Sequence, residues 1–173
     1  MRHLFVLILC AACASSGKNT SSTLSVIDMN RKPLVAISVM EDLAKTPLSS
    51  HAAEAFTKAV FERLQHKNRL HLAQSKAQGR QFLVTMQLVR HQEISQDPNE
   101  LAISVLLKIL DTRTEKPHVV LQEELSLNTP FEKPLTSWND ESFRISPMGL
   151  AHAKLSREIA SRIEDYILLT NRG

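Results

Sequence analysis

The stretch FLVTMQLVRHQEISQDPNELAISVLLKILDTRTEKPHVVLQEELSL, residues 82–127, decides the fold. It holds three runs with apolar residues at alternate positions, separated by short polar turns at 96–99 and 111–117. Such alternation is typical of strands with one buried face, and short turns join neighbouring antiparallel strands. The stretch therefore predicts a three-stranded antiparallel meander.

Upstream of the meander the pattern changes from strand to helix. Residues 34–40 carry β-branched side chains at alternate positions, which indicates a buried strand, and 41–47 read as a loop. Ser49 or Ser50 is placed to cap a helix whose apolar residues recur every four positions. These apolar residues are Ala52, Phe56, Val60 and Leu64. The helix is expected to end near Asn68, and a short strand with Leu70 and Leu72 to follow.

Downstream, residues 128–147 read as a long polar loop, and Ser146 with Pro147 marks the start of a final helix. Each predicted helix has one apolar side, and each predicted strand has at least one apolar face. The economical arrangement is an α+β fold, an antiparallel β-sheet of four to five strands with two α-helices packed on one face. Residues 33–173 are expected to form this single domain.

The amino-acid composition excludes some classes of function. The 173 residues are 43% apolar and 23% charged, as in globular proteins. The four glycines are scattered, which excludes a glycine-rich phosphate loop. A net charge of +3, from 21 basic and 18 acidic residues, argues against a nucleic-acid binder.

The first residues, MRHLFVLILCAAC at 1–13, have the order of a secretory signal: a positive start, an apolar run and small residues. The apolar run is far shorter than the roughly 20 residues of a membrane-spanning helix. Cys-Ala-Ala-Cys at 10–13 resembles the lipobox of bacterial lipoproteins, although Cys10 stands where leucine is usual. The resemblance implies a signal peptide at 1–12, an acylated Cys13, and an anchor and tether at 13–32.

Two other interpretations of the N-terminus stay open. The same residues suit an ordinary secretory signal cut after Ala14, or a buried segment with incidental cysteines. The chain has no cysteine after Cys13, which favours lipidation and excludes a disulfide or a thiol nucleophile within the domain. Ala14 is not the aspartate that retains lipoproteins in the inner membrane, so the resemblance implies the outer membrane, facing the periplasm.

No catalytic, metal or cofactor site is predicted. The seven histidines include no pair spaced as metal ligands on a helix, although His66 and His71 straddle a helix end. Glu123 and Glu124 point to opposite faces of a strand, and the pair at 140–141 lies in a loop. Two further surfaces are weaker candidates for ligand sites. One is an aromatic patch of Trp138 and Phe143, for which burial under the loop is preferred, and the other is a basic surface of Arg80, Arg90, Lys108, Arg113 and Lys116.

The order of elements behind a lipobox resembles the lipopolysaccharide-assembly lipoprotein family. The resemblance rests on HAAEAFTKAVFERL at 51–64, VLLKILDTRTEKPHVVLQEELSL at 105–127 and AHAKLSREIASRIEDYIL at 151–168. It implies a non-enzymatic, lipid-anchored accessory factor in outer-membrane or lipopolysaccharide assembly, whose partner is an outer-membrane β-barrel or lipopolysaccharide itself. The alternative is an envelope lipoprotein that binds a periplasmic protein, like domains of the Tol system or activators of peptidoglycan synthases. A secreted soluble protein or an enzyme is a lesser alternative.

Overall fold

The computed structural model describes residues 32–46, 51–74, 78–94, 99–130 and 141–171. Cys10, Cys13 and Trp138 lie outside these residues. The elements run in the order β1 (Leu34–Ile37), β2 (Glu41–Asp42), α2 (Ala52–Lys67), β3 (His71–Gln74), β4 (Phe82–Ile94), β5 (Glu100–Asp111), β6 (His118–Pro130), α3 (Glu141–Ile145) and α4 (Pro147–Thr170).

The sheet has the strand order β3-β1-β4-β5-β6, and β2 pairs with β4 beyond the end of β1. The predicted meander is confirmed, because β4 pairs with β5 and β5 with β6 in antiparallel register. The sheet is mixed rather than wholly antiparallel, since β1 lies parallel to both β3 and β4. A parallel neighbour requires a crossover, and α2 supplies the crossover from β1 to β3.

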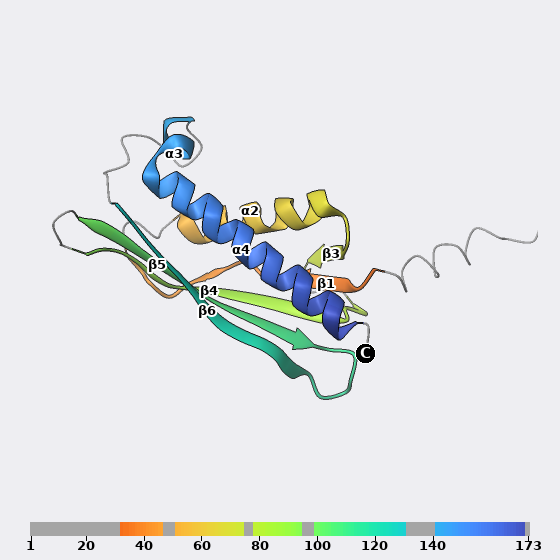
Figure 1. Ribbon diagram of the computed structural model, residues 1–173. Coiled ribbons are helices and arrows are strands. Elements are labelled where there is room, and N and C mark those ends of the chain that lie inside the picture. The colour runs from red at the N-terminus through yellow and green to blue at the C-terminus, as the bar shows by residue number, and fades with distance from the viewer. Residues whose placement is uncertain (1–31, 47–50, 75–77, 95–98, 131–140, 172–173) are drawn as a thin grey trace, which may run out of the picture.

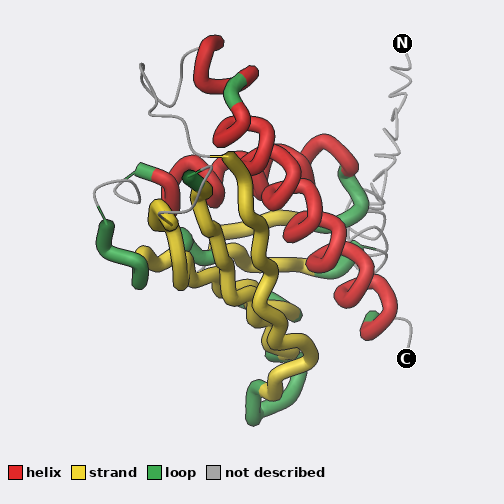
Figure 2. Tube along the Cα trace, turned by 60° about the vertical axis from the view of Figure 1, so that its left-hand side comes forward, coloured by secondary structure: helices red, strands yellow, loops and turns green. Residues whose placement is uncertain are grey.

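Helices α2 and α4 cover one face of the sheet, which confirms the predicted α+β class (Figures 1 and 2). The alternating side chains of the central strands meet the apolar sides of these helices in one core. The largest fully buried side chains are Phe56, Phe82, Leu64, Met86, Leu88, Leu101, Ile103, Leu107, Ile109, Met148, Leu155 and Ile159. No helix in the described residues is long and apolar enough to cross a membrane.

A β-bulge in β4 changes which residues face the helices. The register places Leu88 opposite Val105 and Arg90 opposite Ser104, so Val89 is an extra residue. An extra residue inverts the alternation beyond it. His91 therefore lies in the core under the helices, while the side chain of Arg90 is exposed on the other face of the sheet.

Three boundaries differ from the sequence predictions. Residues Glu41–Asp42, expected in a loop, form β2, because their backbone pairs with β4. The expected loop at 128–147 is shorter, since β6 runs to Pro130 and α3 occupies Glu141–Ile145. Helix α2 is capped by His51 without a side-chain hydrogen bond, rather than by a serine.

Both other predicted helix ends are confirmed. Asn68 ends α2 with φ 51°, the left-handed conformation that asparagine tolerates. Ser146 caps α4, because its Oγ accepts a hydrogen bond from the Gly149 backbone N–H at 3.1 Å. Ser146 Oγ also donates to the Phe143 carbonyl at 2.7 Å, which closes a tight corner between α3 and α4.

Candidate functional site

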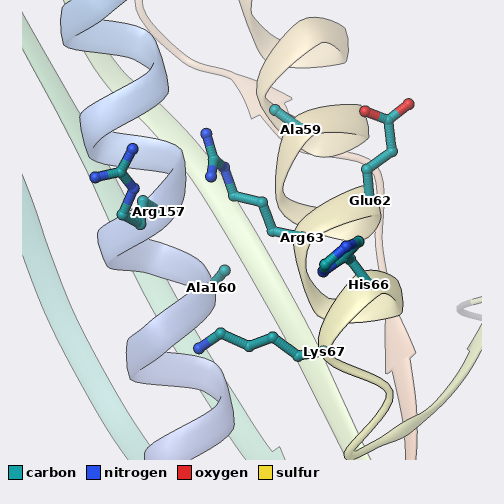
Figure 3. A pocket seen from close by; sticks show the side chains of 7 residues that line it. All are labelled: Ala59, Glu62, Arg63, His66, Lys67, Arg157 and Ala160. Carbon is teal, nitrogen blue, oxygen red and sulfur yellow. The ribbon is translucent and has the colours of Figure 1, made fainter.

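A groove of about 430 Å³ runs between α2 and α4, on the side of the helices away from the sheet (Figure 3). Alanines line it from both helices, Ala59 from α2 and Ala160 from α4, and small side chains there leave room between the helices. Its longer residues are charged or ionisable: Glu62, Arg63, His66, Lys67 and Arg157. We call this the cationic groove.

Two contacts from α2 to α4 fix basic side chains of the cationic groove. Arg63 reaches from α2 and donates through Nη2 to the Ala153 carbonyl of α4 at 3.3 Å. Lys67 Nζ lies 2.5 Å from Glu164 Oε2, so it too bridges from α2 to α4. Figure 3 shows both side chains directed from α2 toward α4.

Glu164 is the buried counter-charge beneath the end of the groove. Its side chain is only 2% exposed, and Arg69 Nη1 approaches its Oε1 at 3.2 Å, while Lys67 binds the other carboxylate oxygen. A carboxylate removed from water needs such compensation, because burial of an unpaired charge costs several kcal/mol. Lys67 and Arg69 keep exposed fractions of 46% and 56%, so they neutralise Glu164 while facing solvent.

The groove carries an excess of positive charge. Its lining holds three basic side chains, Arg63, Lys67 and Arg157, and one carboxylate, Glu62. Figure 3 shows the Glu62 carboxylate directed away from α4. Arg157 is exposed, and within the described parts of the chain no ion pair to its guanidinium is observed. An anion entering the groove therefore meets guanidinium and ammonium groups first.

A second polar cluster lies in the core. His91 of β4 and His152 of α4 approach with their Nε2 atoms 3.0 Å apart, so that one nitrogen donates and the other accepts. The His152 ring stacks on Phe56, with ring centroids 4.4 Å apart, and meets the edge of Phe143. Burial lowers the pKa of His91 to about 4, and burial with the neighbouring His91 lowers the pKa of His152 to about 3.

The histidine pair is neutral at pH 7 and shielded from solvent, which suits a structural role. Two nitrogens are fewer than the three protein ligands of a typical zinc site. Within the ranges that the structure describes, no group of three or more potential metal ligands occurs. Sequence spacing did not reveal this pair, since the two histidines are far apart in the chain and the bulge in β4 places His91 inward.

The structure does not gather all five predicted basic residues on one surface, although Arg80 and Arg113 lie at the same end of the sheet, where Thr112 Oγ1 donates to the Arg80 carbonyl at 2.7 Å. Arg90 and Lys108 lie on the uncovered face of the sheet, opposite Ser104 and Thr85 respectively. Arg113 is engaged structurally: its Nη2 lies 2.7 Å from Asp111 Oδ2, and its guanidinium lies over the Phe82 ring. The Arg113 contacts hold the pKa of Asp111 below its usual range. Arg80 precedes β4 and Lys116 lies in the β5–β6 turn.

The remaining predicted residues are placed as follows. Phe143 is buried against His152, as the preferred interpretation expected, whereas Trp138 and Asp140 lie outside the described residues. Glu123 faces α4 with its Oε1 3.6 Å from Arg162 Nη2, and Glu124 is exposed on the other side of the strand. Cys13, the predicted lipidation site, also lies outside the described residues.

Comparisons with known proteins place the fold. No curated protein matches the sequence. The hypothetical protein CT253 from Chlamydia trachomatis is similar with a TM-score of 0.69 at 20% identity, over 79% of this chain and 98% of that one. Protein XCC0632 from Xanthomonas campestris, of family DUF330, is similar with a TM-score of 0.62 at 10% identity, over 82% of this chain and 89% of that one.

A third solved structure, a PelC dodecamer from Paraburkholderia phytofirmans, gives a TM-score of 0.56 at 12% identity, over 78% of this chain and 90% of that one. At such low identities these likenesses show a shared fold alone. At the level of sequence, the model of DUF7499, a family of unknown function, matches residues 69–171. The chain therefore belongs to the DUF7499 family.

Proposed function

We propose that this protein is a bacterial envelope lipoprotein, held on a membrane by acyl chains on Cys13, that acts by binding rather than by catalysis. The observation that carries the proposal is the stretch at 1–12 with the order of a signal peptide, followed directly by Cys13, in a chain that has no later cysteine. A free cysteine is reactive and is usually retained for its chemistry. Acylation would use the thiol of Cys13, since two or more acyl chains anchor a protein stably in a membrane.

The proposal extends to the outer membrane and to a role in outer-membrane or lipopolysaccharide assembly. Ala14 after the lipidated cysteine supports the outer membrane, and the resemblance to lipopolysaccharide-assembly lipoproteins supports the role. Co-purification in detergent tests the role, and we expect an outer-membrane β-barrel protein to be retained. Retention of a peptidoglycan synthase instead would favour the alternative partner class.

The anchor is tested by the intact mass of the protein extracted from its native membrane. We expect a chain that begins at Cys13 and carries added acyl mass. Cys13→Ala should lose that mass and leave the membrane fraction, while Cys10→Ala, the matched control, should keep both. A chain that begins after Ala14 without added mass would refute the anchor and indicate a secreted soluble protein.

Localisation is tested separately by fractionating inner and outer membranes. We expect the native protein in the outer-membrane fraction. Ala14→Asp should move it to the inner membrane, because aspartate at that position retains lipoproteins there in the enterobacterial sorting scheme. An unchanged distribution of Ala14→Asp, or a native protein in the inner membrane, would contradict the outer-membrane part of the proposal.

A further inference from the structure

We propose that the cationic groove docks the folded domain on a membrane surface rich in anionic phospholipid, with lipid phosphate groups contacting Arg63, Lys67 and Arg157. The inference rests on the proposed function and extends it by giving the anchored domain a preferred face toward its membrane. It follows from three observations: the charge of the groove, the availability of its cations, and the place where the chain leads toward Cys13.

The charge of the groove complements phosphate. Arg63 and Arg157 present planar guanidinium groups from facing helices, and guanidinium forms paired hydrogen bonds with phosphate oxygens. Lys67 adds an ammonium group at the end of the groove. Each basic side chain near an anionic membrane strengthens binding by about fivefold. Because several basic side chains line the same groove, their contributions to binding an anionic lipid surface add together.

The structural roles of these cations do not account for all of their exposed charge. Basic residues in the last turn of α2 complement the helix dipole, and Lys67 with Arg69 neutralises Glu164. Neither role accounts for Arg157, which is exposed on α4. Lys67 and Arg69 are about half exposed, so each can contact a phosphate while it remains close to Glu164.

The chain that leads to Cys13 starts at the same end of the molecule. The His71 backbone N–H donates to the Pro33 carbonyl at 3.0 Å, and Leu34 pairs with His71. Only the turn after α2 separates His71 from Lys67, so β1 begins near the last turn of α2 (Figure 1). The anchor and tether predicted from the sequence at 13–32 directly precede β1 in the chain. An anchor at Cys13 thus holds this end of the domain near the membrane.

Co-sedimentation with vesicles tests the inference. The protein used is the mature-length chain from residue 13 carrying Cys13→Ala, so that no acyl chain contributes to binding. We expect it to bind vesicles that contain phosphatidylglycerol, to release as salt is raised, and not to bind pure phosphatidylcholine vesicles. Arg157→Glu should weaken binding by about tenfold or more, since it reverses one charge in the groove.

Arg90→Glu is the matched control, because it makes the same charge change on the uncovered face of the sheet. It should weaken binding much less than Arg157→Glu. Equal effects of the two variants, or equal binding to both kinds of vesicle, would overturn the inference. None of these outcomes bears on acylation, which the intact mass tests independently.

Discussion

Helix α4 buries two ionisable side chains, and the protein accommodates them in opposite ways. Near its start, His152 lies among aromatic rings and shares a hydrogen bond with His91. Near its end, Glu164 lies between Lys67 and Arg69. The histidine is kept neutral, because burial lowers its pKa. The glutamate is paired with two cations instead.

The difference has a consequence for the surface. A neutral histidine pair needs no charged partner, so both rings are buried in the core without a counter-ion. The buried carboxylate of Glu164 is paired with two half-exposed cations, and one of them, Lys67, also lines the cationic groove. The way in which each polar group is buried thus separates a structural cluster from a candidate binding site on the same helix.

Acidification should destabilise the protein by protonating the His91–His152 pair, and this is the largest effect on stability that we expect. Both histidine pKa values lie below the unfolded value of 6.5, so the unfolded chain binds more protons as the pH falls. Stability from this pair is intact above pH 6.5 and declines toward pH 4. Between pH 7 and pH 5 we expect the free energy of unfolding to fall by about 4 kcal/mol, measured by urea unfolding at each pH.

A variant without one titrating group tests this assignment. His152→Gln should reduce the change in stability between pH 7 and pH 5 by about half, whatever its stability at pH 7. An equal pH dependence in the native protein and in His152→Gln would show that the buried pair does not cause it.

A steric clash at the corner between α3 and α4, beside His152, should also destabilise the protein. A Cβ atom at Gly149 would lie 1.9 Å from the Phe143 carbonyl oxygen, so Gly149→Ala must displace α3. We expect a loss of about 3 kcal/mol in the free energy of unfolding, measured by urea denaturation. Gly79→Ala adds the same methyl group in open space at φ +73° and should cost only about 1 kcal/mol. Equal losses would contradict the packing argument.

Much of the fold is readable from the sequence, and its exceptions have physical causes. Alternation predicted the meander, and the pair Ser146–Pro147 predicted the start of α4. Alternation extended beyond Leu88 would place Arg90 inward, and the bulge at Val89 instead buries His91. A bulge is a property of the pairing between two strands, so the pattern of one strand does not reveal it.

The cationic groove was beyond sequence reasoning for a similar reason. Arg63 and Arg157 belong to helices that are distant in the chain, and only the packing of α2 against α4 brings them together. The basic residues that the sequence singled out belong instead to the strands and turns of the sheet. The signal at Cys13 needs no tertiary structure, and it stays a prediction.

Removing Lys67 and Arg69, the cations that pair with Glu164, should destabilise the protein. The double change Lys67→Met and Arg69→Met leaves the Glu164 carboxylate buried without its partners. We expect a loss of about 2 kcal/mol in the free energy of unfolding, measured at pH 7. Glu164→Gln should cost about 1 kcal/mol, because the cations it leaves are half exposed and become hydrated. A larger loss from Glu164→Gln would reverse this account of which partner depends on the other.

Arg157→Glu is expected to change the stability of the protein least. Arg157 lines the groove without neutralising Glu164, so Arg157→Glu should change the free energy of unfolding by less than about 0.5 kcal/mol. Urea denaturation measures this value on the protein used for vesicle binding. A stability change as large as that of the Lys67 and Arg69 double variant would make Arg157 part of the structural pairing. A near-neutral change, with weakened vesicle binding, would separate cations that serve Glu164 from a cation that serves the groove alone.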